Sequence, residues 1–451
     1  MTEIDTLPGI ENAVSIARDQ HPISRKHIAP NALKVLYRLS EHGFAAFLVG
    51  GGVRDLLLGK QPKDFDIATD ATPEDIRDLF KNARIIGRRF RIVHIRFGRE
   101  IIEVTTFRAH HEARNAIPEH VSRRQIKGLD SAHSEAGMIL RDNVYGDIDE
   151  DAARRDFTVN ALYYTTQGFR VLDFCGGMED LQARQIRIIG DAQERYREDP
   201  VRMLRAIRFS AKLDFDIAAD TAAPIAELAE LLESISPARL FDETIKLMTC
   251  GYAERAFHLL GESGLGNYLF APTLEALKHG SAEAGKLVEL ALRNTDTRLS
   301  QDKSVTPAFL FAALLWPVLQ LRLAQANDDQ QAPQQIFHQA ASDVLLEQLN
   351  FTAIPKRFTI GAREIWDMQR RLERRNRRNV FSVFNHPRFR AGYDFLLLRE
   401  EAGEDLNGLG DWWTQFQNGD TNQKNDMVNA LATTGSRRRR RKRKKSAGKQ
   451  S

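Results

Sequence analysis

The sequence predicts a mixed α+β protein, with a small β-sheet domain in its N-terminal part, helical domains after it and a disordered basic tail. Between residues 30 and 199 the apolar residues change repeatedly between helical spacing and strand-like runs. Beyond Asp199 strand patterns nearly vanish, and apolar residues recur at spacings of three and four. The last fifteen residues hold ten of the 65 Lys and Arg residues. With 451 residues, the chain is long enough for several hydrophobic cores.

The elements of the N-terminal part follow from the local pattern. Helical spacing that ends in Gly43 predicts a first helix, and Thr72 followed by Pro73 is typical of a capped helix start. The predicted elements are a helix over 31–43, a strand over 45–51, a helix over 53–59, a strand over 64–69, a helix over 72–80 and strands over 83–87, 91–98 and 100–107. We therefore expect at least four strands in one sheet. The polar, aperiodic stretch 108–141 predicts a long loop.

The charge distribution favours a nucleic acid partner. Without the ten basic residues that begin at Arg437, 55 basic residues remain against 61 acidic ones, so the body of the chain is slightly acidic. A concentrated cationic arm attracts polyanions such as RNA, although a solubilising or targeting tail has a similar composition. The arginine-rich stretch from Lys356, which includes one tryptophan, also suits phosphate contact and base stacking.

Cysteine content and hydropathy limit the cellular compartments in which the protein is expected. The two cysteines, Cys175 and Cys250, exclude a disulfide framework and a cysteine-based zinc site, and they fit a reducing cytoplasm. The N-terminus lacks the basic and apolar regions of a signal peptide. The longest apolar run starts at Ala308 and has about twelve residues, short of the roughly twenty that span a bilayer. We expect a buried helix there and no transmembrane segment.

The stretch LVGGGVRDLLLG places three glycines between a strand and a helix. Its spacing fits neither a P-loop nor a dinucleotide fingerprint. Gly50 and Gly51 would let the backbone approach an anion, and Arg54 in the first helical turn would add a cation. The turn is therefore a candidate triphosphate site, with a purely structural turn as the alternative.

Two aspartates follow in DFDIATD. Asp64 and Asp66 stand two residues apart in a predicted strand, so both carboxylates should point to one face, about 6 to 7 Å apart. Paired carboxylates of this kind hold Mg²⁺, with Mn²⁺ as an alternative, and two such ions clamp the oxygens of a phosphoryl transfer. Glu103 is a candidate third carboxylate. It would either face the metals or pair with Arg108.

A second constellation lies in RRDFTVNALYY. Asp156 and Asn160 are one helical turn apart in a helix-like run and would share a face, with Arg155 alongside. An acceptor, an amide and a guanidinium suit ribose hydroxyls or a metal-bound phosphate. A helix N-cap at Asp156 is the structural alternative.

The stretch REDPVRMLRAIRFSAKL predicts a helix with a charged row. Asp199, Arg202, Arg205 and Arg208 recur at intervals of three on it. With few neighbouring acids, the three arginines would repel one another unless an anion covers them. Asp199 and Arg202 could also accept from and donate to a base edge. A solvated basic face is the alternative.

Together, in this order and spacing, these four motifs resemble the bacterial class II nucleotidyltransferase superfamily. Within it the chain is most similar to the bacterial poly(A) polymerases, through the stretches IIGRRFRIVHIRFG from Ile85, YREDPVRMLRAIRF, NTDTR at Asn294 and TPAFLFAALLW, and through the arginine-rich C-terminus. The resemblance implies a β-sheet nucleotidyltransferase head, a helical neck and a helical body. It implies that Asp64 and Asp66 bind Mg²⁺, that Asp156 is catalytic near the ribose, and that the remaining candidates contact the nucleotide. The implied domains are an N-terminal extension over 1–29, the head over 30–170, a nucleotide- and RNA-binding neck over 171–270, an RNA-binding body over 271–417 and a disordered basic tail over 418–451.

The implied activity is template-independent polynucleotide adenylyl transfer. The enzyme would add a poly(A) tail to RNA 3′ ends from ATP, releasing pyrophosphate by a two-metal mechanism, and its tail could recruit RNA-decay proteins. The tRNA CCA-adding enzymes share these motifs and are the first alternative. A catalytically dead RNA-binding adaptor and a metal-dependent glycosyltransferase are two further alternatives.

Overall fold

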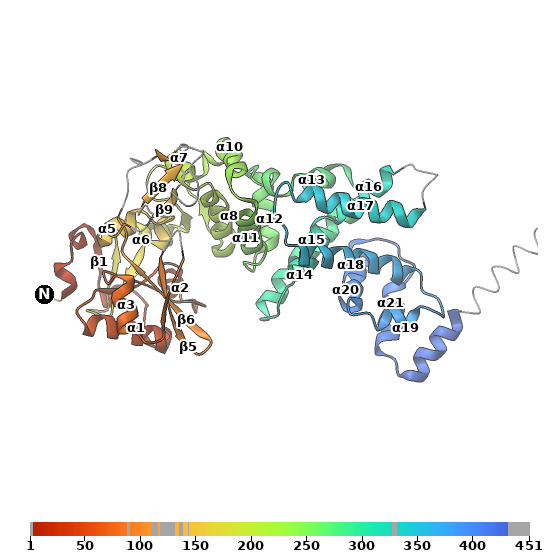
Figure 1. The fold of residues 1–451 in the computed structure, drawn as a ribbon, viewed down its shortest axis with the longest axis horizontal. Helices are drawn as coiled ribbons and strands as arrows, with labels where there is room; N and C mark the ends of the chain where they lie inside the picture. The colour runs from red at the N-terminus through yellow and green to blue at the C-terminus, as the bar shows by residue number, and fades with distance from the viewer. Residues whose placement is uncertain are drawn as a thin grey trace, which may run out of the picture. The chain divides into compact units, whose positions relative to one another are not determined.

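The chain forms two compact units, over residues 1–232 and 233–451. The computed structural model describes residues 3–87, 91–109, 116–117, 131–134, 139–142, 144–326 and 332–431. All candidate site residues lie in the first unit, which combines a sheet with short helices (Figure 1). The second unit is helical. This arrangement confirms the predicted α+β class.

The first unit is built on an eight-stranded mixed sheet. Its strand order is β1-β11-β10-β2-β3-β6-β5-β4. The strands are β1 (Val14–Ile16), β2 (Ala46–Val49), β3 (Asp66–Thr69), β4 (Ala83–Ile86), β5 (Ile92–Phe97), β6 (Glu100–Thr106), β10 (Leu162–Tyr164) and β11 (Val171–Asp173). Only β3 and β6 pair in parallel. Because β1 and β11 belong to this sheet, it extends beyond the head boundaries predicted at residues 30 and 170.

Apolar periodicity explains the predicted helices around the sheet. Helix α1 (Pro30–Glu41) buries Val35, Leu36 and Leu39, which join the core beneath β2 and β3. The start of α3 (Pro73–Leu79) is fixed by Thr72, whose side chain accepts from the backbone N–H of Asp75. The other helices of this unit are α2 (Gly51–Leu57), α5 (Ile148–Ala153), α6 (Gly177–Ala183), α7 (Ala192–Glu198), α8 (Val201–Leu213), α9 (Ala219–Ala222) and α10 (Ile225–Leu228).

Two predictions of local structure in this unit are wrong. The stretch 108–141, predicted as a loop, contributes a three-stranded sheet of β7 (Ala116–Ile117), β8 (Ser131–Ser134) and β9 (Ile139–Asp142); its other residues from 110 on lie outside the described ones. A strand ladder is formed by backbone N–H and C=O groups, so a polar stretch without apolar alternation can also form one. The run after Asp156 is not an α-helix but a 3-10 turn, η5 (Thr158–Asn160), followed by β10.

The second unit is a set of packed helices. They are α11 (Pro237–Met248), α12 (Ala253–Glu262), α13 (Asn267–His279), α14 (Ala282–Ser300), α15 (Pro307–Leu314), α16 (Trp316–Gln325), α17 (Pro333–Gln348), α18 (Lys356–Glu373), α19 (Val380–Phe384), α20 (Phe389–Ala402) and α21 (Leu409–Asn418). Trp366 of α18 is fully buried, and its indole N–H donates to the carbonyl of Ala312 (2.9 Å). The prediction that this tryptophan stacks on bases is therefore wrong, because it belongs to the core.

The prediction of a disordered tail over 418–451 is wrong for its first part. Residues 421–431 are helical, and Val428 is buried against a cluster that includes Trp413 and Phe416. Met427 and Leu431 pack on the same cluster, so this segment does carry apolar residues at helical spacing. The basic run from Arg437 lies outside the described residues.

In the part of the chain that the structure describes, no single helix has the length and apolar character to cross a bilayer. One pair, α15 and α16, passes on length and composition together but bends by 41°.

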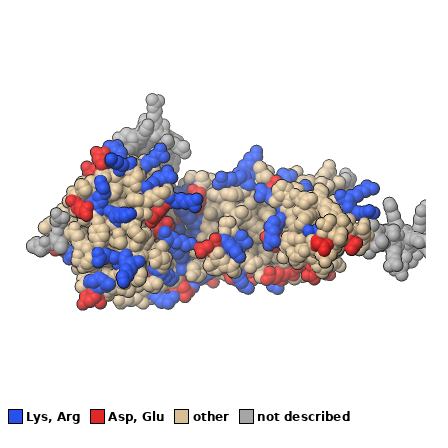
Figure 2. Space-filling view, turned by 90° about the horizontal axis from the view of Figure 1, so that it is seen from below, with Lys and Arg blue, Asp and Glu red and all other residues tan. Residues whose placement is uncertain are grey.

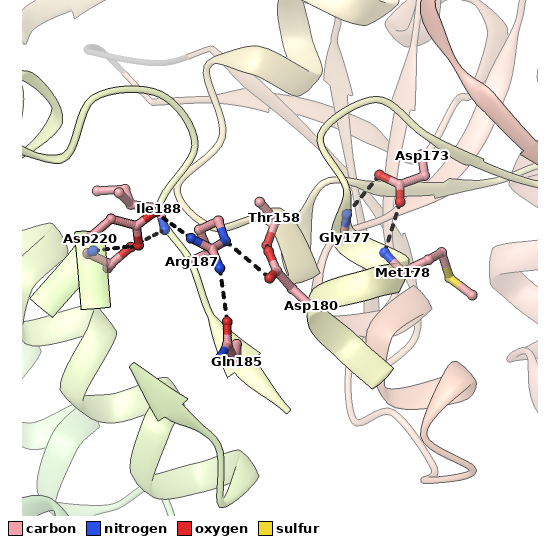
Figure 3. A network of polar contacts seen from close by, with 10 residues as sticks. Thr158, Asp173, Gly177, Met178, Asp180, Gln185, Arg187, Ile188 and Asp220 are labelled. Atoms are coloured by element: carbon pink, nitrogen blue, oxygen red, sulfur yellow. Dashed lines mark hydrogen bonds and ion pairs between the residues drawn. The ribbon is translucent and has the colours of Figure 1, made fainter. Parts of the chain in front are cut away.

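A polar network ties η5 to the segment that precedes α7 and α8 (Figure 3). Asp180 is buried, and its carboxylate accepts from the Thr158 hydroxyl (2.7 Å) and from Nε of Arg187 (3.2 Å). Arg187 also pairs with Asp220, and its carbonyl accepts from the N–H of Thr158 (3.0 Å). The network therefore fixes the path of the backbone directly after Asp156.

We expect Thr158→Val to destabilise the protein by about 1 to 3 kcal/mol, because it removes a donor from a buried carboxylate. Chemical denaturation of the purified protein measures this loss. Thr158→Ser keeps the hydroxyl and should keep most of the stability. A loss in Thr158→Ser as large as that in Thr158→Val would show that keeping the hydroxyl does not keep the stability, and it would contradict the role given to the hydrogen bond to Asp180.

Candidate active site

Asp66 is the first residue of β3 and lies in the middle of the sheet. It pairs with Val49 on β2 and with Glu103 on β6. Asp64 lies two residues before the strand and is exposed, so the prediction that both aspartates are strand residues is wrong for Asp64. Phe65, between the two, is buried in the core. Phe65 therefore points into the core, as expected, while Asp64 is exposed and Asp66 is half-buried.

Burial and neighbouring charges mark the position of Asp66. Burial, followed by the charges of Glu103 and Asp64, raises the pKa of Asp66 to about 6 against the lowering effect of Arg155. Glu103 contacts His94, with 3.0 Å between Oε1 and Nε2. Of the two alternatives for Glu103, the structure therefore supports the one in which its carboxylate lies near the aspartates. The side chain that contacts Glu103 is His94, not Arg108.

This donor set fits a divalent cation. Crowded carboxylate oxygens are the ligands that Mg²⁺ prefers, and a cation between them would relieve the repulsion that raises the pKa of Asp66. Within the described ranges, no group of three or more His, Cys, Asp or Glu side chains is arranged to hold a metal. A metal here would therefore depend on Asp64 and Asp66, with its other ligands coming from substrate or water.

The glycine turn lies directly beside Asp66. Gly50 has φ of +69° and ψ of −141°, a conformation that essentially only glycine adopts. A Cβ atom at Gly50 would lie 3.9 Å from Oδ2 of Asp66 and 3.7 Å from Nη1 of Arg155. The bare backbone of this turn thus borders both an anionic and a cationic side chain.

Arg155 is held rigidly at this turn. Its Nε donates to the hydroxyl of Tyr163 (2.7 Å) and its Nη2 donates to Asp151 (3.0 Å). The Tyr163 hydroxyl donates to the same carboxylate (2.7 Å). Asp151 and Tyr163 are functional neighbours that the sequence reasoning missed, although the spacing of four between Asp151 and Arg155 is a visible signal. The arrangement leaves Nη1 facing Gly50.

Arg54 lies beneath the turn instead of in the open. Its side chain is 2% exposed and pairs with Asp55 (2.6 Å), while Nη1 donates to Oδ1 of Asn160 (2.6 Å). Asn160 in turn donates to Asp156 (3.2 Å), as their predicted shared face requires. A Cβ atom at Gly51 would lie 3.3 Å from the Arg54 guanidinium. Arg54 therefore supports the backbone of the turn and links it to Asp156.

Asp156 joins this network to helix α8. Nε of Arg205 donates to Oδ2 of Asp156 (2.7 Å), and Nη2 donates to the same oxygen. Burial raises the pKa of Asp156, but the charge and hydrogen bonds of Arg205 and the donation from Asn160 outweigh burial and bring the pKa to about 2. Asp156 is therefore ionised at neutral pH and anchors Arg205.

We expect Asp156→Asn to cost about 2 kcal/mol of stability at neutral pH, which corresponds to the lowering of the pKa from 3.8 to about 2. Because a lowered pKa stabilises the fold above its unfolded value, this contribution should fade as the pH falls from 3.8 through 2. Urea denaturation of both proteins across this range measures the difference. A gap that stays constant down to the lowest pH would contradict the ion pair.

The charged row on α8 is only partly as predicted. Asp199 lies before the helix, as the C-terminal cap of α7. Arg202 is buried and its Nη1 donates to Glu198 (2.6 Å) and to the carbonyl of Arg195 (2.8 Å). Arg208 lies over the ring of Phe209 (4.9 Å). The expectation of few neighbouring acids is therefore wrong, because Glu198 balances Arg202 and Asp156 balances Arg205.

Comparison with known proteins gives consistent matches. Three family models match in order: the poly A polymerase head domain over residues 46–187, the probable RNA and SrmB-binding site of polymerase A over 214–278, and the polymerase A arginine-rich C-terminus over 329–446. A solved tRNA-processing enzyme in its apo form I has a TM-score of 0.56 and 19% identity, covering 91% of this chain and 98% of that one. This similarity shows a shared fold.

Two curated relatives separate the alternatives. A CCA-adding enzyme of Geobacillus stearothermophilus is 38% identical, but the match covers only 53% of this chain and 54% of the relative. Poly(A) polymerase I of Escherichia coli O6:H1 is 49% identical over 92% of this chain and 88% of its own length. The similarity thus extends over most of the chain for the second relative and over about half of it for the first. The chain belongs to the bacterial poly(A) polymerase family.

Proposed function

We propose that this chain is a template-independent polynucleotide adenylyltransferase that adds AMP units from ATP to RNA 3′ ends and releases pyrophosphate. The observation that carries this proposal is the position of Asp66, which lies among carboxylates and directly beside the Gly50 turn and Arg155. Membership of the poly(A) polymerase family supports the same activity. We place the activity in the bacterial cytoplasm, where RNA 3′ ends and ATP occur together.

Asp64 and Asp66 are the residues that would hold Mg²⁺ or Mn²⁺. When bound, such ions would lower the pKa of the RNA 3′-hydroxyl and offset the charge of the triphosphate. The chain itself positions the triphosphate. Gly50 and Gly51 allow the phosphates to approach the backbone, and Arg155 presents a fixed cation beside them.

The neck residues would hold the nucleoside. Asp156, fixed by Arg205 and Asn160, lies where the glycine turn and α8 meet and is our candidate for the ribose contact. Arg202 makes both of its hydrogen bonds through Nη1. Its Nη2 makes none to a residue that the structure describes and could donate to a base edge, with Asp199 as the acceptor. Arg208 and Arg205 would add positive charge near the phosphates.

The RNA product must stay bound to the enzyme for repeated addition of AMP. Lys and Arg side chains are spread over the face drawn in Figure 2, with acidic side chains among them. The match of residues 214–278 to a probable RNA-binding model supports RNA contact by the segment after α8. Recruitment of RNA-decay proteins by the basic tail stays a prediction.

A pyrophosphate-release assay tests the reaction type. We expect Mg²⁺-dependent release from ATP with an RNA that ends in a 3′-hydroxyl, and none with the same RNA ending in a 3′-deoxy nucleotide. Release that does not depend on the 3′-hydroxyl would indicate a nucleotide hydrolase. Salt-sensitive RNA binding with no release from any nucleotide would indicate the adaptor alternative.

A further inference from the structure

A second basic site lies in the helical unit, in a pocket between α17 and α18. The pocket has a volume of about 170 Å³. Its lining is formed by Gln334, His338, Asp367, Arg370, Arg371, Arg374 and Asn379. Three guanidinium groups thus share one small space with a single carboxylate, Asp367, whose Oδ1 lies 3.4 Å from Nδ1 of His338. The pocket therefore carries a net positive charge.

The chain does not neutralise these arginines itself. Residues 370–378 contain six arginines and one acid, Glu373, and that acid pairs with Arg399 from α20 (2.8 Å). In the described part of the chain, none of the six arginines forms an ion pair. This contrasts with the arginines on α8, where Glu198 and Asp156 supply the partners. Cations that are gathered without internal partners favour an external anion.

The pocket is partly preorganised. The guanidinium of Arg370 lies over the ring of Phe337 (4.7 Å), which holds it against the wall. Burial and the neighbouring charge of Arg374 lower the pKa of Arg370 in spite of the opposite effect of Asp367 and Glu373, so an anion in the pocket would relieve the repulsion between the two arginines. Arg371 and Arg374 are exposed and can adjust to the anion.

The chemistry of the lining identifies the anion class. The forked N–H groups of arginine suit the oxygens of a phosphate, and Gln334 and Asn379 add neutral donors. A free nucleotide would also need a face for its base. Phe337 is 5% exposed and covered by Arg370, and Trp366 is buried, so neither offers such a face. A phosphate of a polynucleotide backbone fits this lining better than a nucleotide.

We propose that this pocket binds a backbone phosphate of the RNA substrate, independently of sequence. The inference rests on the proposed function, because it assigns the RNA that the active site extends. It adds a contact in the second unit that retains RNA between additions. Losing it should weaken RNA binding without changing the rate at which a bound 3′ end reacts.

The test compares two double variants of the full chain. Arg371→Gln with Arg374→Gln removes two charges from the pocket, and Arg377→Gln with Arg378→Gln removes two exposed charges from the same segment outside it. Because all four side chains are exposed, both variants should fold, which thermal melting checks. Fluorescence anisotropy with labelled single-stranded RNAs of two sequences, at several KCl concentrations, measures affinity. A parallel titration with pyrophosphate tests a free phosphate source.

We expect the pocket variant to bind both RNAs roughly tenfold more weakly, equivalent to about 1.4 kcal/mol. Its slope of log affinity against log salt should fall by about 0.7 for the lost phosphate contact. The control variant should change less, and pyrophosphate should not compete. Equal losses in both variants, no loss in the pocket variant, or competition by pyrophosphate at low concentration would each overturn the proposal.

The assay separates this inference from the proposed function. At saturating RNA, the wild type and the pocket variant should add the first AMP at the same rate. If the wild type binds RNA but adds no AMP, the proposed function fails, whatever the variants do. If the wild type adds AMP and the pocket variant binds RNA normally, only the pocket proposal fails.

Discussion

Asp66→Asn is expected to abolish adenylyl transfer while leaving the protein folded. The amide keeps the shape of the side chain but cannot supply the negative charge that a divalent cation requires. We expect kcat to fall by about 10³-fold or more, a barrier increase of roughly 4 kcal/mol. Primer extension with purified protein and Mg²⁺ measures this loss.

The stability of Asp66→Asn without metal should stay equal to that of the wild type or rise, although its activity is lost. Because the pKa of Asp66 is raised to about 6, folding without metal favours its protonated form, and ionisation costs stability as the pH rises from 3.8 through 6. The neutral amide avoids this cost, so the Tm of Asp66→Asn without metal should equal or exceed that of the wild type above pH 6. Mg²⁺ should raise the Tm of the wild type more than that of the variant.

Asp78→Asn provides the matched control. Asp78 is an exposed carboxylate of α3 in the same unit, and its partner is the neighbouring Arg77. The substitution changes the same atoms and the same charge away from the candidate site, so activity should remain near the wild-type level. Comparable losses in the two variants would mean that net charge, not the position of Asp66, determines activity.

Gly50→Ala is expected to reduce kcat/KM by about 10²-fold, the scale of a displaced reacting group. The added methyl would occupy the space between Asp66 and Arg155, 3.9 Å from Oδ2 of the first and 3.7 Å from Nη1 of the second. These are ordinary contacts, so the methyl does not clash with the protein. It fills the place that we assign to the triphosphate.

Backbone strain is the competing explanation for Gly50→Ala, and Gly59→Ala isolates it. Gly59 also has φ of +69°, but no heavy atom lies within 4 Å of a Cβ placed there. Both variants should lose about 1 to 3 kcal/mol of stability from the strained backbone. Only Gly50→Ala should lose activity, and an equal loss in Gly59→Ala would show that strain at the ends of α2 is sufficient.

Elements whose side chains face a core could be predicted from the sequence. In α1, Val35, Leu36 and Leu39 have to face the sheet, so burial itself imposes the spacing that the sequence displays. The ladder of β7, β8 and β9 could not be predicted, because the polar stretch that forms it carries no periodic apolar signal. The start of β3 could not be predicted either, because strand pairing, and not residue type, leaves Asp64 outside the strand.

The candidate site shows a similar division. Asp64, Asp66 and Gly50 could be proposed as site residues from their residue types and spacing, whereas the role proposed for Asp156 follows from the family resemblance. The partner of Arg205 could not be identified, because Asp156 is 49 residues away and only the fold brings them together. Glu198 stands four residues before Arg202, so its pairing was visible in the sequence. The sequence therefore reveals a charge partner that is close along the chain, but not one that only the fold brings near.

Nucleotide selectivity in primer extension tests the central claim most directly. The measurement uses the wild type with Mg²⁺, a generic RNA and a tRNA that lacks its 3′ end, each with ATP alone or CTP alone. We predict long ladders from ATP on both RNAs and little extension from CTP. Extension that occurs only on the tRNA and stops after two or three nucleotides would contradict poly(A) addition and identify CCA addition instead.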